Sequence, residues 1–116
     1  MEHILYKQIL KPGCKEEYVR RHSKCWPSLL TTIRKSGIKR ELIWLDGDNI
    51  YIYMMAPDIG AALRKLTNTS AFKKWNGEMS AMLSLIQGYS ENREVDSLPK
   101  VFDLESQLAA ALKRSI

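Results

Sequence analysis

A short turn in the middle of the chain does most to limit the folds that it can adopt. Residues 38–45 and 50–55 are rich in side chains that favour strands, and the tetrapeptide Asp46-Gly47-Asp48-Asn49 separates them. Aspartate, glycine and asparagine between two such runs are typical of a tight hairpin turn. The centre of the chain is therefore predicted to be a β-hairpin, and the remaining elements must be arranged around it.

The segments before this hairpin read as a strand followed by a long helix. Residues 2–11 alternate as a strand does, and residues 15–35 carry a helical apolar face that contains Pro27. A proline at this position indicates either a kink near residues 23–26 or the first turn of a second helix. We expect Gly37 to end the helical region as a left-handed cap.

The segments after the hairpin predict two helices, a loop, a short strand and a terminal helix. One helix is expected over 59–66, and the next carries apolar side chains spaced by three to four residues. These side chains are Phe72, Trp75, Met79, Met82 and Leu83. A polar loop is expected over 87–98, a last strand over 101–104 and a terminal helix over 105–114.

The resulting order of elements is β, α, β, β, α, β, followed by the C-terminal helix. This order predicts an α+β fold of the ferredoxin-like type, with a four-stranded antiparallel sheet and helices on one face. We expect one domain over residues 1–116, with 104–116 as a helical extension. The other face of such a sheet stays open, and Trp44, Tyr51 and Tyr53 could lie on it. A homodimer that buries sheet against sheet would cover these aromatic side chains.

Composition excludes several classes of protein. The 116 residues are 45% hydrophobic and 27% charged, which is ordinary for one globular domain. The net charge of +5 comes from scattered basic pairs without a nucleic-acid motif, so we expect no nucleic-acid partner. The longest apolar run, residues 50–56, is too short to span a membrane, and we expect no membrane partner.

The two cysteines predict free thiols. Cys14 and Cys25 lie on one predicted helix, about 16 Å apart along its axis, whereas a disulfide requires Cα atoms within about 7 Å. Free thiols and the absence of a signal-peptide pattern at the N-terminus favour a cytoplasmic protein.

The strongest candidate for chemistry is the stretch EEYVRRHSKCWP. Tyr18, His22 and Trp26 are four residues apart, so a helix places them on one face. Because the pKa of histidine lies near neutrality, His22 is a candidate for proton transfer. Cys25 next to His22 could be a nucleophile, but a small packing residue is the favoured interpretation.

No motif in the sequence predicts a cofactor or a metal. The six glycines do not form a phosphate-binding loop, and no cysteines and histidines have the spacing of zinc ligands. The sequence also has no G-x-S-x-G nucleophile motif.

The pattern E-E-Y-x-R-R-H-x-x-x-W-P resembles the L-rhamnose mutarotase family. Further resemblance lies at Ser36-Gly37, at residues 43–46, at residues 72–75 and at residues 98–102, so it covers roughly residues 1–104. The resemblance implies a dimeric ferredoxin-like α/β barrel and an isomerase that interconverts the α and β anomers of a 6-deoxy-hexose without a cofactor or metal. The terminal helix looks like an addition to the usual family length.

The same resemblance suggests roles for five residues. His22 matches the proton donor of the family, Tyr18 a sugar-binding tyrosine, and Trp75 the first of two tryptophans that contact the sugar. The chain departs from the family at Glu41, where a substrate-binding tyrosine is typical, and at Asn76, where the second tryptophan is typical. We expect His22 to be catalytic and the other four side chains to bind substrate. Glu41 could also be a second acid or base, or a solvent-facing residue of its strand.

Three interpretations of the function stay open at this point. The first is a mutarotase that acts on L-rhamnose, L-fucose or another sugar. The second is a different enzyme on the same scaffold, such as a cofactor-free oxygenase or a dehydratase. The third is a non-catalytic module that binds a small ligand or a protein.

Overall fold

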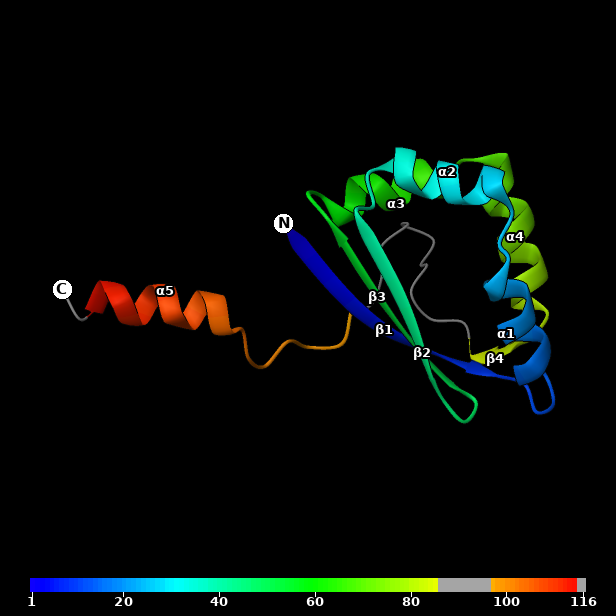
Figure 1. Cartoon of the computed structure of the whole chain (residues 1–116), viewed down its shortest axis with the longest axis horizontal. Coiled ribbons are helices and arrows are strands. Elements are labelled where there is room, and N and C mark those ends of the chain that lie inside the picture. Colours follow the sequence, from blue (N-terminus) through cyan, green and yellow to red (C-terminus); the bar gives the residue numbers. More distant parts are fainter. Residues whose placement is uncertain (86–96, 115–116) are drawn as a thin grey trace.

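The computed structural model describes residues 1–85 and 97–114. In these ranges a four-stranded antiparallel sheet has the order β2-β3-β1-β4. The strands are β1 (Glu2–Leu10), β2 (Arg40–Asp46), β3 (Asn49–Ala56) and β4 (Leu83–Leu85). The helices are α1 (Lys15–Ser23), α2 (Pro27–Ser36), α3 (Ile59–Thr67), α4 (Ser70–Ser80) and α5 (Leu104–Arg114). Figure 1 shows α1 to α4 on one side of the sheet and α5 projecting away from it. The predicted ferredoxin-like α+β fold is confirmed.

The central hairpin forms where the sequence predicts it. Asp46 of β2 pairs with Asn49 of β3, and the side-chain amide of Asn49 donates a hydrogen bond of 3.1 Å to the carbonyl of Asp46. Gly47 has a φ of 60°, a left-handed conformation that glycine adopts without steric cost. The long β2–β3 ladder therefore starts from local turn chemistry.

The two faces of the sheet differ as the alternation along β3 requires. Its even-numbered residues, Ile50, Ile52, Met54 and Ala56, are buried under the helices. The odd-numbered residues lie on the open face, where Tyr51 pairs with Trp44, and Trp44 is 54% exposed. Tyr53 also lies there, in contact with His3. The expected aromatic open face is confirmed.

The prediction of a single helix over residues 15–35 is wrong. Helix α1 ends at Ser23, and α2 starts at Pro27 after Trp26, whose φ of −57° and ψ of 133° are not helical. The proline ring disfavours helical geometry at the residue before it, while Pro27 itself suits the first turn of a helix. The second alternative for Pro27 is therefore the correct one. Gly37, with a φ of 114°, ends α2 as predicted.

The break between α1 and α2 also separates the two cysteines from a common helix. Cys14 precedes α1 and Cys25 follows it, so the two do not share one helix. Both are nevertheless free thiols, as predicted.

The last strand is not at residues 101–104. Residues 101–103 have no regular structure, and the fourth strand is β4, which pairs with Ile9 and Leu10 at the end of β1. The helix predicted to include Leu83 ends at Ser80, and the backbone N–H of Lys11 donates to the carbonyl of Met82 to hold the turn before β4. Three residues are too few to show the alternation of a strand, and the spacing of Met79, Met82 and Leu83 also fits a helix.

The C-terminal region is described from residue 97. The predicted polar loop over 87–98 lies outside the described residues except at Ser97 and Leu98, and the N–H of Leu98 donates to the carbonyl of Leu5. The predicted terminal helix is present as α5, and it has no buried residue. No helix within the described ranges is long and apolar enough to cross a membrane.

Candidate active site

Two cavities lie between β2 and the helices α1, α2 and α4. The inner cavity has a volume of about 60 Å³, and the outer one has a volume of about 320 Å³, within the range of small-molecule sites. They adjoin, because five side chains line both of them: His22, Ile33, Glu41, Ile43 and Trp75. Tyr18 and Asn76 line the inner cavity. The structure thus places all five sequence-predicted site residues around one hollow.

Each element brings its site residues by the periodicity of its own backbone. Tyr18 and His22 are one turn apart on α1, and Trp75 and Asn76 are adjacent on α4. Glu41 pairs across the sheet with Met54, which is buried, so both residues point to the helix side. The alternation of β2 therefore turns Glu41 toward the site, and the solvent-facing alternative for Glu41 is not what the structure shows.

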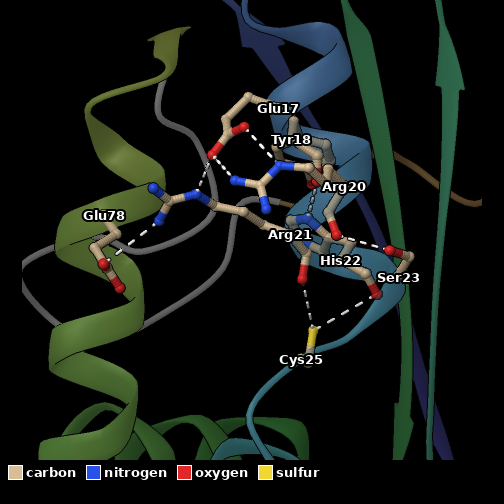
Figure 2. Close-up of polar contacts among 8 residues, drawn as sticks. All are labelled: Glu17, Tyr18, Arg20, Arg21, His22, Ser23, Cys25 and Glu78. Atoms are coloured by element: carbon tan, nitrogen blue, oxygen red, sulfur yellow. Dashed lines mark hydrogen bonds and ion pairs between the residues drawn. The ribbon is translucent and has the colours of Figure 1, made fainter.

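His22 is held in one defined tautomer. Its Nδ1 lies 2.7 Å from the carbonyl oxygen of Tyr18 (Figure 2). Because a carbonyl can only accept, Nδ1 carries the hydrogen, and in the neutral ring Nε2 keeps a lone pair. The imidazole also lies 4.0 Å from the ring of Tyr18 and meets the ring of Trp75 at 5.2 Å, edge to face. Burial lowers the pKa of His22, and the hydrogen bond to Tyr18 opposes this in part, so the fold favours the neutral imidazole.

Glu41 is the second group in the site whose pKa is shifted by burial. Burial raises the pKa of its carboxyl to about 7. Among the described residues no hydrogen bond or ion pair to this carboxyl is found. The pKa of the Tyr18 hydroxyl is raised, chiefly by burial and next by the charge of Glu41, so Tyr18 stays protonated. This coupling places Glu41 within electrostatic reach of the Tyr18 hydroxyl.

Cys25 does not have the setting of a nucleophile. Burial, followed by the charge of Glu41, raises the pKa of its thiol, so the thiolate is disfavoured. Its sulfur lies 3.8 Å from the backbone carbonyl of Arg21 and 3.7 Å from that of His22. The geometry supports a packing role for Cys25.

Trp26, the third aromatic residue of the opening motif, lines neither cavity. Its ring meets that of Trp75 at 5.2 Å, edge to face, and the ammonium group of Lys74 lies 5.1 Å from its centre. Trp26 therefore packs against Trp75, which itself lines both cavities.

Sequence reasoning missed the ion pairs that connect the two site helices. Glu17 binds Arg20 and Arg21 on α1, with 2.8 Å between its carboxylate and Nε of Arg21, and Arg21 reaches Glu78 of α4 at 3.4 Å (Figure 2). Hydrogen bonds from Arg20 and Arg21 lower the pKa of Glu17 to about 2. The spacing of Glu17 and Arg21 could have signalled the local pair, but nothing in the sequence indicates Glu78.

The inner wall also contains two residues of β1 that the sequence reasoning did not single out. Tyr6 and Gln8 line the inner cavity, and both are nearly fully buried. Their even numbering along a strand could have placed them on the core face. In the described ranges no group of three or more histidine, cysteine, aspartate or glutamate side chains is placed to hold a metal ion.

Comparisons with known proteins agree on one protein family. The family model for L-rhamnose mutarotase (rhaM) matches residues 4–104. An L-rhamnose mutarotase of Burkholderia ambifaria (strain AMMD) is 33% identical over 107 residues, which are 90% of this chain and all of the relative. Another, of Paraburkholderia xenovorans (strain LB400), is 27% identical over 91% of this chain and 98% of the relative.

Solved structures show the same fold. The crystal structure of an L-rhamnose mutarotase from Formosa agariphila superposes with a TM-score of 0.66 at 21% identity, covering 90% of this chain and 99% of that one. Tetracenomycin F2 cyclase from Streptomyces glaucescens superposes with a TM-score of 0.58 at 13% identity, over 89% of this chain and 99% of the cyclase. At such identities these likenesses concern the fold alone.

Proposed function

The chain belongs to the L-rhamnose mutarotase family, and we propose that it is an isomerase that interconverts the α and β anomers of a free 6-deoxy-hexose, L-rhamnose first. The observation that carries the proposal is the setting of His22. Its imidazole uses Nδ1 to bind the carbonyl of Tyr18 and lines the outer cavity next to the indole of Trp75. The volume of this cavity, about 320 Å³, suits a small molecule such as a sugar.

This reaction needs little beyond proton transfer. The ring opens when the ring oxygen gains a proton and the anomeric hydroxyl loses one, and closure on the other face of the carbonyl gives the second anomer. Nε2 of His22 can exchange protons with the sugar, and general acid/base catalysis of this kind typically contributes about 10²- to 10⁴-fold. The indole of Trp75 offers an apolar face for the C–H side of a pyranose. The hydroxyl of Tyr18 is a donor and acceptor for a sugar hydroxyl.

Magnetisation exchange between the anomer signals of a sugar, followed by NMR, tests the proposal. We expect acceleration for L-rhamnose or L-fucose, and near-complete loss in His22→Ala with an unchanged circular dichroism spectrum. The matched control is His3→Ala, which changes the other histidine on the opposite face of the sheet and should keep the activity. If neither sugar nor a broad panel of aldoses responds, the mutarotase function is refuted.

The preferred sugar depends on Glu41 and Asn76. Both are hydrogen-bonding groups in the cavity wall, at positions where the family resemblance implies aromatic residues. We propose that they adjust the site to the hydroxyl pattern of the sugar, with L-fucose as the alternative substrate. The double substitution Glu41→Tyr and Asn76→Trp should shift relative kcat/KM toward L-rhamnose. Unchanged ratios across the sugars would show that these positions do not select the substrate.

We further propose a homodimer formed through the open face of the sheet. The support is the exposed aromatic surface of Trp44, with Tyr51 and Tyr53 beside it on β3. Light scattering after size-exclusion chromatography should give twice the mass of the chain, and Trp44→Glu should give a single chain. A wild-type protein that stays monomeric at high concentration would contradict this.

The free thiols of Cys14 and Cys25 support a reducing, cytoplasmic location.

A further inference from the structure

The inner cavity brings together ionisable side chains from three elements of the fold. Tyr6, Tyr18, His22 and Glu41 line it, and burial is the main cause that raises the pKa of the Tyr18 hydroxyl, so Tyr18 keeps its proton. His22 and Glu41 line both cavities, from α1 on one wall and from β2 on the other. A sugar in the hollow therefore lies between an imidazole and a carboxyl group.

The hydrogen bonds of His22 and Glu41 decide which of their atoms can bind a substrate. Nδ1 of His22 is used by the carbonyl of Tyr18, so Nε2 is the atom of the imidazole that can meet a substrate. The carboxyl of Glu41 has no partner among the described residues, so both of its oxygens can serve the substrate. Burying the charged form of a carboxyl without a counter-charge is costly, so such a group keeps its proton and can donate it.

We propose that Glu41 is the second proton-transferring group of this site: it supplies the proton for the ring oxygen, while Nε2 of His22 takes the proton of the anomeric hydroxyl. The inference rests on the mutarotase function proposed above. It assigns to Glu41 a catalytic role in addition to sugar binding, and it makes His22 the base in ring opening.

The proton inventory of this step is balanced. During opening, the carboxyl proton of Glu41 passes to the ring oxygen as the bond from that oxygen to the anomeric carbon breaks. The hydroxyl on the anomeric carbon gives its proton to Nε2 and becomes the carbonyl. The open sugar then lies between a carboxylate and an imidazolium, and rotation about the bond next to the carbonyl exposes its other face. Closure returns both protons and restores the starting enzyme.

The protonation states agree with this assignment. Burial lowers the pKa of His22 below 6.5 and raises that of Glu41 to about 7. Between these values the imidazole is the free base and the carboxyl is mostly the acid, which reverses the usual order of the two side chains.

The other groups that face Glu41 come from every wall. Tyr18 lies on α1 and Cys25 follows it, Asn76 comes from α4, and Gln8 comes from β1. The charged side chains around the outer cavity are Arg34 from α2 and Lys39 and Arg40 next to Glu41 in sequence. These basic side chains line the outer cavity. The raised pKa of Glu41 has burial as its cause.

The pH dependence of kcat/KM in single variants identifies which group is the acid. The wild type should give a bell with its upper limb near pH 7. Glu41→Gln should lower kcat by about 10²-fold or more, since one acid/base group is lost, with KM little changed. Its residual activity should rise with pH to a plateau, because only the protonation of His22 still limits it. Glu16→Gln, the same change at an exposed position of α1, is the control and should leave the bell unchanged.

Two outcomes would overturn the inference. If Glu41→Gln changes KM alone, Glu41 only binds the sugar. If its profile falls as pH rises, His22 is the acid.

A direct titration decides the matter even if Glu41→Gln has no measurable activity. NMR of wild-type protein with ¹³C-labelled glutamate carboxyls, assigned with the Glu41→Gln variant, should give a Glu41 pKa near 7 and a His22 pKa below it. A Glu41 carboxyl that titrates below pH 5 would overturn the inference. Because this measurement needs no turnover, it separates failure of the inference from failure of the mutarotase proposal, which the aldose panel tests.

Discussion

Replacing Glu41 with glutamine should stabilise the fold, and the gain should grow as pH rises. The pKa of this carboxyl rises from an ordinary value of 4.5 to about 7 in the folded protein because burial disfavours its charged form. The folded state therefore holds a proton that the unfolded chain has released over this range. Stability falls with pH wherever the folded state binds more protons, so the wild type loses stability from pH 4.5 to about 7.

The magnitude follows from the size of the rise in pKa. One pKa unit corresponds to about 1.4 kcal/mol, so the full penalty above pH 7 is about 3 kcal/mol. Glutamine has the shape of the protonated acid and no charge, so it escapes this penalty. Between pH 5 and pH 8 the advantage of Glu41→Gln in free energy of unfolding should grow by about 2–3 kcal/mol. At the urea dependence usual for small domains, this is a difference of about 1–2 M in the midpoint.

Urea unfolding followed by tryptophan fluorescence at pH 5 and pH 8 measures this difference. His22 and all other titrating groups are present in both proteins, so their contributions largely cancel. Glu16→Gln is the matched control, because an exposed substitution usually changes stability by less than about 0.5 kcal/mol. An advantage of Glu41→Gln that is the same at both pH values would refute the reasoning, since the charge of Glu41 would then not be linked to folding.

Three further perturbations test other parts of the structure. Trp75→Ala should raise KM for the sugar by about tenfold, which is about 1.4 kcal/mol of lost stacking, and an unchanged KM in saturation kinetics would exclude the stacking role. Leu29→Ala, at a side chain that is 1% exposed, should cost about 2–5 kcal/mol in urea unfolding, whereas Leu30→Ala, at 54% exposure on the same helix, should cost much less. Ending the chain after Asp103 removes α5, which has no buried residue, and should change Tm by only a few degrees; a large loss would show that α5 stabilises the fold.

Much of the fold follows from patterns within a few residues of each other. The turn at Gly47 defines the hairpin, and Gly37 ends α2, because both positions require a left-handed backbone that glycine provides. The helical spacing of Tyr18 and His22 places both on the inner face of α1. In each case the information lies in local steric preference and periodicity, which the sequence displays directly.

The errors arise where long-range contacts outweigh local pattern. Strand β4 forms because the end of β1 offers a free edge to residues 83–85, and no local signal in three residues reveals this. The break before Pro27 is a different case, because it follows from the local steric effect of the proline ring on Trp26, and the sequence offered it as one of two alternatives.

The sequence alone determined which chemical groups this protein has: an imidazole at His22, a carboxyl at Glu41 and an indole at Trp75. It also determined the periodicities that turn these groups to one side of their elements. Only the tertiary structure decided their protonation. The carbonyl of Tyr18 selects the free nitrogen of His22, and the walls of the cavity remove water from Glu41. Desolvation and hydrogen bonding are properties of the surrounding fold. The spacing of residues in the sequence therefore could not show that the fold favours the protonated carboxyl of Glu41 and the neutral imidazole of His22.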